Sequence, residues 1–255
     1  MYFDTHVHLN SEQYENVEKI IEDALKNNVR KMIVIGYDLE TSIKAINIAN
    51  QYDFIYASVG IHPSEIKKMD TRDLESLEKL LSENKVVAIG EIGLDYHWDK
   101  DNKEDQKRIF VEQIKLANKY NLPLIIHSRD ANEDTLRVLK ENKQYYNKGI
   151  MHCYSYSFES AKEFIKLGFY LAFGGALTFL NAKENKEVVR NISLEHLLIE
   201  TDAPYLTPHP YRGKQNEPKY IYLVVEEISR LKNVTKEEVA RITYINACNL
   251  FGVEK

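Results

Sequence analysis

The chain has 255 residues, 44% of them hydrophobic, which is enough to bury one large core of about the size of a single eightfold α/β barrel. Its net charge of −5, from 34 basic and 39 acidic residues, argues against a protein that wraps duplex DNA with a broad basic face, although bound cations could still supply positive charge at a phosphate. The two cysteines offer no disulfide framework. No basic segment followed by an apolar one opens the chain, so we expect a cytoplasmic protein without a membrane span.

Short apolar runs alternate with helical patterns along nearly the whole chain, and no linker rich in proline, glycine or serine divides it. We therefore expect one domain over residues 1–255. Several runs are continuous and β-branched, which is typical of parallel strands buried on both faces. The predicted strands span residues 2–6, 31–35, 55–59, 86–91, 124–127, 149–152, 170–173 and 197–200.

The segments between the strands are predicted to be helical. Apolar residues recur at helical spacing from Val17 to Leu25 and from Ile221 to Leu231. A final helix is expected after Thr235, which forms a capping-box pattern with Glu238. Eight strand–helix alternations without a hairpin signal predict a TIM-type (β/α)8 barrel. An open doubly wound sheet is the alternative, but it would need a phosphate-binding glycine loop that does not follow the first strand here.

Residues that can bind a metal stand at the carboxyl ends of six predicted strands. In a barrel these ends converge on one rim, which is where such folds place active sites. The residues are His6 and His8 after the first strand, His62 after the third, Glu91 after the fourth, His127 after the fifth, His152 after the sixth and Asp202 after the eighth. We therefore predict a metal site in one mouth.

His6 and His8 are two residues apart on a strand, so both point to the same face and could hold one metal. Two rim histidines bonded to backbone carbonyls are about equally consistent with the pattern. Asp4 shares that face and is expected to support a ligand or to form buried hydrogen bonds.

Glu91 ends a buried apolar strand, so its carboxylate must be paired or must bind a cation, because burying it alone is too costly. Its two oxygens could bridge two cations. The alternative is an ion pair with Arg129 or Lys214.

His127 and His152 end apolar strands that neighbour each other in a barrel, which makes them a candidate second metal pair, although either one alone is more often a core histidine. Asp202 could bind the first metal and also accept a proton from an attacking water. Glu200 lies deeper on the same strand face and is expected to be a supporting residue. Cys153 has the opposite parity to His152, so we expect it to face the helix layer.

These residues lie in motifs that together resemble the TatD family of metal-dependent deoxyribonucleases, within the amidohydrolase-like barrel superfamily. The resemblance runs almost end to end. The motifs are Phe-Asp-Thr-His-Val-His-Leu at 3–9, Gly-Ile-His-Pro at 60–63, Gly-Glu-Ile-Gly-Leu-Asp-Tyr at 90–96, His-Ser-Arg at 127–129, Glu-Thr-Asp-Ala-Pro-Tyr-Leu at 200–206, Arg-Gly-Lys at 212–214, Asn-Glu-Pro at 216–218 and Asn-Leu-Phe-Gly at 249–252.

The resemblance implies two divalent cations, which from the mixed ligands would be Mg, Mn, Zn, Ni or Fe. It implies that one is bound by His6, His8 and Asp202, the other by His127 and His152, with Glu91 between them. It also implies that His62 contacts substrate rather than metal. Tyr156 stands where the family tends to have glycine, which adds bulk beside the second metal pair.

The activity that the resemblance implies is hydrolysis of DNA phosphodiesters, often as a 3′–5′ exonuclease. Asp202 and Glu91 are the expected catalytic carboxylates, acting with a metal-activated water. Arg129 and Arg212 are candidates for gripping phosphate oxygens, with structural ion pairs as an equally weighted alternative.

The expected partner is a free single-stranded 3′ end of DNA, with no membrane and no obligate protein partner. His62 and Tyr96 could hydrogen-bond to or stack on the terminal nucleotide. A D-aminoacyl-tRNA deacylase or another ester or amide hydrolase on the same metal site is the alternative. Barrels that this chain also resembles, but that cleave C–N bonds, bridge their metals with a carboxylated lysine at the end of strand four. This chain has Glu91 at that position, and its nearest lysine, Lys85, begins the strand. The difference favours a nuclease-like function. A catalytically dead binding barrel would be expected to have lost ligands, and none is missing.

Overall fold

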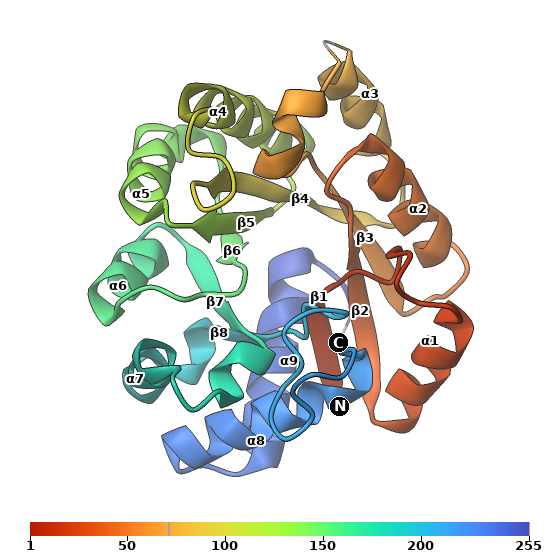
Figure 1. The fold of residues 1–255 in the computed structure, drawn as a ribbon, viewed down its shortest axis with the longest axis vertical. Helices are drawn as coiled ribbons and strands as arrows, with labels where there is room; N and C mark the ends of the chain where they lie inside the picture. The colour runs from red at the N-terminus through yellow and green to blue at the C-terminus, as the bar shows by residue number, and fades with distance from the viewer. Residues whose placement is uncertain (71, 255) are drawn as a thin grey trace.

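The computed structural model describes residues 1–70 and 72–254. Eight parallel strands pair in chain order from β1 to β8 and stand inside a ring of helices (Figure 1). The strands are β1 (Tyr2–Val7), β2 (Val29–Ile35), β3 (Ile55–Val59), β4 (Val86–Asp95), β5 (Leu124–Arg129), β6 (Gly149–Met151), β7 (Phe169–Phe173) and β8 (Leu197–Ile199). The prediction of a (β/α)8 barrel is confirmed, and β4 is the strand that most exceeds its predicted length.

Helices follow the strands along the chain and cover the outside of the barrel (Figure 1). They are α1 (Val17–Lys26), α2 (Leu39–Ala49), α3 (Asp73–Leu80), α4 (Lys103–Tyr120), α5 (Asn132–Glu141), α6 (Phe158–Lys166), α7 (Lys183–Asn191), α8 (Ile221–Lys232) and α9 (Lys236–Phe251). Short 3-10 helices are η1 (Pro63–Lys68), η2 (Lys143–Tyr145), η3 (Gly175–Thr178), η4 (Leu194–His196) and η5 (Pro218–Tyr220). The predicted start of the last helix is confirmed, because the Thr235 hydroxyl accepts a hydrogen bond from the Glu238 amide at 3.1 Å. None of these helices is long and apolar enough to cross a membrane.

The apolar core has two parts. A large outer cluster lies between the strands and the helices, as expected when strands are covered on their outer face. A smaller cluster joins strand residues such as Phe3, Ile33, Ile125 and Leu198 to the last helix. The α9 residues in it are Tyr244, Ala247, Cys248, Leu250 and Phe251. The last helix therefore seals the strand ends opposite the metal-capable residues, which leaves the carboxyl rim as the open end.

The seam between β1 and β8 is closed by only a few bonds. The Asp202 amide donates to the His6 carbonyl at 2.9 Å, and the His8 amide donates to the Ala203 carbonyl at 2.8 Å. The Asp4 carboxylate joins them by accepting the Thr201 amide at 2.9 Å and the Thr201 hydroxyl at 2.5 Å. Asp4 therefore forms buried hydrogen bonds across the seam, which was one of its two expected roles.

An irregularity in β1 decides which side chains face the barrel interior. The register between β1 and β2 shifts between Asp4 and Val7. Phe3 packs in the inner cluster, whereas Val7 packs in the outer one. Because strict alternation would place residues 3 and 6 on opposite faces, this shift lets both Phe3 and His6 point inward.

Gly93 brings β4 unusually close to β5. Its φ is +139°, a conformation that residues with a side chain rarely adopt. A Cβ at this position would overlap the carbonyl oxygen of His127. The glycine thus allows the two strands that carry Glu91 and His127 to approach each other.

Candidate metal centre

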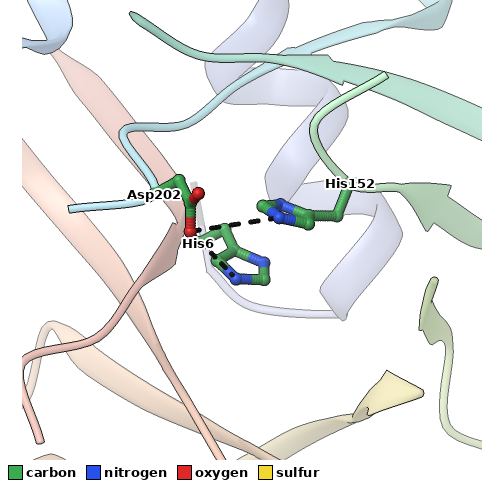
Figure 2. Close-up of side chains that lie close together, drawn as sticks. All are labelled: His6, His152 and Asp202. Atoms are coloured by element: carbon green, nitrogen blue, oxygen red, sulfur yellow. Dashed lines mark ion pairs between the residues drawn. The ribbon is translucent and has the colours of Figure 1, made fainter. Parts of the chain in front are cut away.

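The structure brings the six predicted metal ligands together in one connected cluster at the carboxyl rim. They come from β1, β4, β5 and the segments that follow β1, β6 and β8. Figure 2 shows three of them, His6, His152 and Asp202, turned toward one another. The rings of His6 and His152 stack with their centroids 3.5 Å apart. Side chains separated by as many as 196 positions in the sequence are thus neighbours in the fold.

The first group of atoms gathers around the end of β1. The Nε2 atoms of His6 and His8 are 3.2 Å apart. Asp202 Oδ1 lies 3.4 Å from His8 Nε2 and 3.7 Å from His6 Nε2. Glu91 Oε2 lies 3.5 Å from His6 Nε2. Two imidazole nitrogens and two carboxylate oxygens therefore face one small volume.

The second group lies on the other side of Glu91. Its Oε1 atom is 2.8 Å from His127 Nδ1 and 3.8 Å from His152 Nε2. Each oxygen of Glu91 therefore faces a different set of histidines. This is the placement expected of a carboxylate that bridges two cations.

The chemistry of the first group fits a cation. When Nε2 atoms of two imidazoles face each other, only one of them can donate a proton to the other, and the remaining neighbours are acceptor oxygens. The Nδ1 atoms of His6 and His8 have no hydrogen-bond partner in the part of the chain that the structure describes. Neutral imidazoles and carboxylates in this arrangement are ordinary ligands of divalent first-row metals.

The ion-pair partners of Glu91 in residues 1–70 and 72–254 are all histidines, so the alternative pairing with Arg129 or Lys214 is not observed. Burial by itself would raise the pKa of Glu91, but the imidazoles around it, His62 and His6 first, outweigh burial and hold the pKa well below its usual value. Glu91 is therefore ionised at neutral pH.

Asp202 is ionised for a similar reason. Burial acts to raise its pKa, but a hydrogen bond from His8 and the electrostatic interactions with His152 and His6 lower it below the usual value. An ionised carboxylate at this place can bind a cation or accept a proton.

Two further carboxylates hold the histidines of the second group from behind. Asp95 Oδ2 lies 3.0 Å from His127 Nε2, and Glu200 Oε2 lies 3.0 Å from His152 Nδ1. Glu200 is thus a supporting residue, as expected. Burial lowers the pKa of His152, but Glu200 first, and then Glu91 and Asp202, more than offset burial and raise the pKa to about 10, so a cation bound here would have to displace the proton on Nε2. A carboxylate behind an imidazole selects the tautomer and the orientation of the ring.

Asp95 was not singled out by sequence reasoning, although a signal was present. Asp95 lies four residues after Glu91 on the same strand, and β4 extends through it. Residues four apart on a strand share a face, so a strand of this length would have placed both carboxylates at the site.

His62 lies at the edge of the cluster. Its Nε2 atom is 3.7 Å from Glu91 Oε1, and its Nδ1 atom accepts the Ser64 amide at 3.1 Å, which caps η1. Burial first, and then the charge of His127, lower the pKa of His62 to about 3, so the ring is neutral. It lies beside the proposed ligands, and 14% of its side chain is exposed.

Tyr96 does not fit its expected role as a stacking surface. Its side chain is buried, its hydroxyl donates to Asp134 at 2.7 Å, and the Lys103 ammonium lies 4.3 Å from the ring centroid. The ring directly after β4 is thus covered by protein and offers no free face for stacking in this structure, while its expected hydrogen bond to a nucleotide stays a prediction.

Arg129 and Arg212 form no ion pair in the described residues, so their alternative role as structural ion pairs is not observed. The Arg212 guanidinium lies 3.9 Å from the ring centroid of Phe179, and the Arg129 guanidinium lies 5.5 Å from that of Trp98. Both positive charges are free of carboxylates and available to an anion.

Cys153 and Tyr156 lie in the segment after His152. The Cys153 thiol is within 4.8 Å of ligand atoms of His152 and Glu200, so the expectation that it faces the helices was wrong. Its φ of +45° breaks strand alternation just after β6 ends. The Tyr156 hydroxyl lies 2.9 Å from Ser128 Oγ, which fastens this segment to β5.

The geometry defines a class of protein: a barrel whose rim carries a buried cluster of histidines and carboxylates suited to divalent metal. A sequence model described as TatD related DNase matches residues 3–252. The chain is 52% identical to the uncharacterized metal-dependent hydrolase YabD of Bacillus subtilis, over 99% of this chain and 100% of that protein. It is 36% identical to the uncharacterized metal-dependent hydrolase YcfH of Escherichia coli, over 98% of this chain and 96% of that protein.

The fold agrees with these matches. The crystal structure of YjjV, a TatD homologue from Escherichia coli, superposes with a TM-score of 0.94 at 32% identity, covering 99% of this chain and 98% of that one. The chain belongs to the TatD-related DNase family, and it is a metal-dependent hydrolase.

Proposed function

We propose that this protein hydrolyses DNA phosphodiester bonds and removes nucleotides stepwise from a free single-stranded 3′ end, using two divalent cations. The observation that carries the proposal is the position of Glu91, with Oε2 facing His6 and Oε1 facing His127 and His152. A bridging carboxylate between two histidine groups is an arrangement that suits phosphoryl chemistry. The description of the matching family as DNases gives independent support.

The ligand sets follow from the two groups of atoms. His6, His8 and Asp202 would hold one cation, His127 and His152 the other, and Glu91 would contact both. Bound there, divalent cations lower the pKa of a water and offset the charge that develops on a phosphate.

The protein side chains supply the proton acceptor and the orientation. Asp202 is ionised at neutral pH and lies 3.4 Å from His8 Nε2, where it can take up the proton of the attacking water. Glu200 and Asp95 keep the rings of His152 and His127 in place from behind. His62, neutral and beside Glu91, accepts the Ser64 amide at Nδ1 and can donate a hydrogen bond from Nε2 to an oxygen of the bound phosphodiester.

A free strand end suits this site better than a long duplex. The net charge of −5 provides no broad basic face, whereas Arg129 and Arg212 offer two positive charges that no carboxylate neutralises in the described residues. A guanidinium can bind two phosphate oxygens at once.

The test is a cleavage assay on 5′-labelled single-stranded DNA. We expect a ladder of shortened products that a chelator abolishes and that Mg or Mn restores. A strand with a blocked 3′ end should stay intact. Asp202→Asn should abolish cleavage, whereas Glu141→Gln, an exposed carboxylate at the end of α5, should cleave as the wild type does.

Three outcomes would contradict parts of the proposal. If closed circular single-stranded DNA is cut as fast as linear DNA, entry by a strand end is wrong. If only D-aminoacyl-tRNA or a cyclic imide is hydrolysed, the substrate class is wrong and Tyr156 becomes the first residue to examine. If Asp202→Asn cleaves normally, Asp202 is not the proton acceptor.

A further inference from the structure

Two aromatic side chains are exposed at the rim beside the cluster. Trp98 is 71% exposed and Tyr205 is 48% exposed, and they are the two aromatic members of the set of exposed large hydrophobic residues in the described chain. Trp98 follows β4 and Tyr205 follows β8, strands on opposite sides of the barrel (Figure 1). Single exposed apolar side chains are common on protein surfaces, so exposure alone does not indicate a binding site. The surroundings of Trp98 distinguish it.

The backbone under Trp98 is linked directly to the second histidine group. The amides of His97 and Trp98 donate to Asp95 Oδ1 at 2.9 and 3.0 Å. The other oxygen of the same carboxylate lies 3.0 Å from His127 Nε2. One side chain therefore sets both the orientation of a proposed metal ligand and the course of the chain that presents the indole.

The loop is also fastened on its far side. The Gln106 amide group donates to the carbonyls of Asp95 and Asp99 at 3.0 and 3.1 Å. The Lys67 ammonium pairs with the Asp99 carboxylate at 2.9 Å. The backbone is thus ordered while the indole stays in solvent, so binding a planar ligand on it costs little conformational entropy.

The charges around the indole suit a nucleotide. The Arg129 guanidinium lies 5.5 Å from the centroid of the Trp98 ring and has no carboxylate partner in the described residues. The nearby acidic groups are engaged, Asp99 with Lys67 and Asp130 with His97 at 3.2 Å. An aromatic face next to an unpaired arginine matches a base next to a phosphate.

We propose that Trp98 is a stacking surface for a base of single-stranded nucleic acid, and that Arg129 binds the adjoining phosphate. This inference rests on the proposed function and gives the site a base-binding element that the metal cluster lacks. It replaces the role expected of Tyr96, whose ring is buried.

Trp98 is the single tryptophan of the chain, so the intrinsic tryptophan fluorescence reports on it alone. The experiment uses magnesium-loaded Asp202→Asn protein, in which the strand stays intact. The probes are a short fluorescein-labelled thymidine oligonucleotide, followed by anisotropy, and unlabelled oligonucleotides with and without bases. We expect the thymidine strand to quench the tryptophan emission at the concentrations at which it binds, and the abasic strand to quench it much less.

Kinetics supply the second readout. In otherwise wild-type protein, Trp98→Ala should raise KM for a short strand about tenfold with little change in kcat, within the range expected for the loss of one stacked base. Trp98→Phe should retain most of the affinity. Leu180→Ala is the matched control, because Leu180 is an 88% exposed apolar residue that should have no effect.

Binding without quenching, equal quenching by the abasic strand, or an unchanged KM in Trp98→Ala would overturn the stacking proposal and leave DNA cleavage untouched. Conversely, base-dependent quenching in Asp202→Asn, together with a wild-type protein that fails to cleave DNA, would support the stacking surface and reject the proposed function.

Discussion

At the residue scale, the candidate centre depends on carboxylates that do not themselves face the cations. Asp95 and Glu200 each accept a hydrogen bond from the outer nitrogen of an imidazole, which leaves the inner nitrogen free to bind a metal. Burial acts to raise the pKa of Asp95, but the His127 hydrogen bond and the loop amides lower it to about 2. This acceptor is therefore ionised at every pH at which the enzyme would be assayed.

We predict that Asp95→Asn weakens metal binding at His127 by about 10- to 100-fold. The asparagine oxygen can still accept the loop amides of His97 and Trp98, but its NH2 group would donate to His127 Nε2. The ring proton would then move to Nδ1, the nitrogen that faces Glu91, and would block it. Metal titration by calorimetry, with elemental analysis of the same preparations, measures the effect.

The matched control is Asp130→Asn, because Asp130 is a nearby carboxylate that contacts His97 and not the cluster. It should bind metal as the wild type does. If Asp95→Asn binds metal at both sites as tightly as the wild type does, Asp95 supports only the loop at His97 and Trp98 and not the metal ligand His127.

At the element scale, the barrel closes between its first and last strands through the side chain of Asp4. Burial raises the pKa of Asp4 to about 7, and hydrogen bonds from Thr201 only partly offset burial. Because this pKa lies above the value of 3.8 for an unperturbed aspartate, the folded protein binds more protons than the unfolded chain between these two values.

We therefore predict that the contribution of Asp4 to the stability of the metal-free protein falls as the pH rises from about 4 to about 7, by up to about 1.4 kcal/mol per pH unit. An asparagine at position 4 is neutral throughout and can both accept the Thr201 amide and donate to the Thr201 hydroxyl. Urea unfolding of the wild type and of Asp4→Asn at several pH values measures the difference.

As the pH rises, the unfolding free energy of Asp4→Asn should increase relative to that of the wild type. Glu141→Gln, which is exposed at the end of α5, should follow the wild type. Parallel curves for the wild type and Asp4→Asn would show that the Asp4 carboxyl does not titrate in this window.

At the scale of the whole molecule, bound cations would join strands that are far apart in the sequence. The proposed ligands lie on or after β1, β4, β5, β6 and β8. Since the unfolded chain cannot gather these side chains, metal binds the folded state preferentially and stabilises it by mass action.

We predict that metal at about 100 times its dissociation constant adds about 2.7 kcal/mol of stability, which corresponds to a rise of about 5–10 °C in Tm for a domain of this size. Glu91→Gln should lose most of that rise, because Glu91 faces both groups. Thermal unfolding with chelator and with added Mn or Zn measures it, and Glu141→Gln should keep the full shift. An equal Tm with and without metal would mean that the cluster does not bind these cations.

The sequence alone was sufficient to predict the barrel and the residues of its mouth. Short apolar runs at regular intervals, several of them continuous and β-branched, indicate buried parallel strands, and these runs predicted all eight. Polar residues directly after such runs must lie at the carboxyl rim, which is why His6, Glu91 and His127 could be named without coordinates. These inferences hold because hydrophobic periodicity can be read within each segment. Strands that are joined by helices run parallel, so their carboxyl ends share one rim.

The tertiary structure alone decided how those residues are oriented and supported. The register shift in β1 turned both Phe3 and His6 inward, and the left-handed backbone at Cys153 put its thiol beside the site. The extension of β4 placed Asp95 behind His127, and the segment that follows β4 exposes Trp98 and buries Tyr96. Each of these outcomes depends on packing between segments that are distant in the sequence, and strand alternation cannot predict them because a bulge or one positive φ reverses the parity.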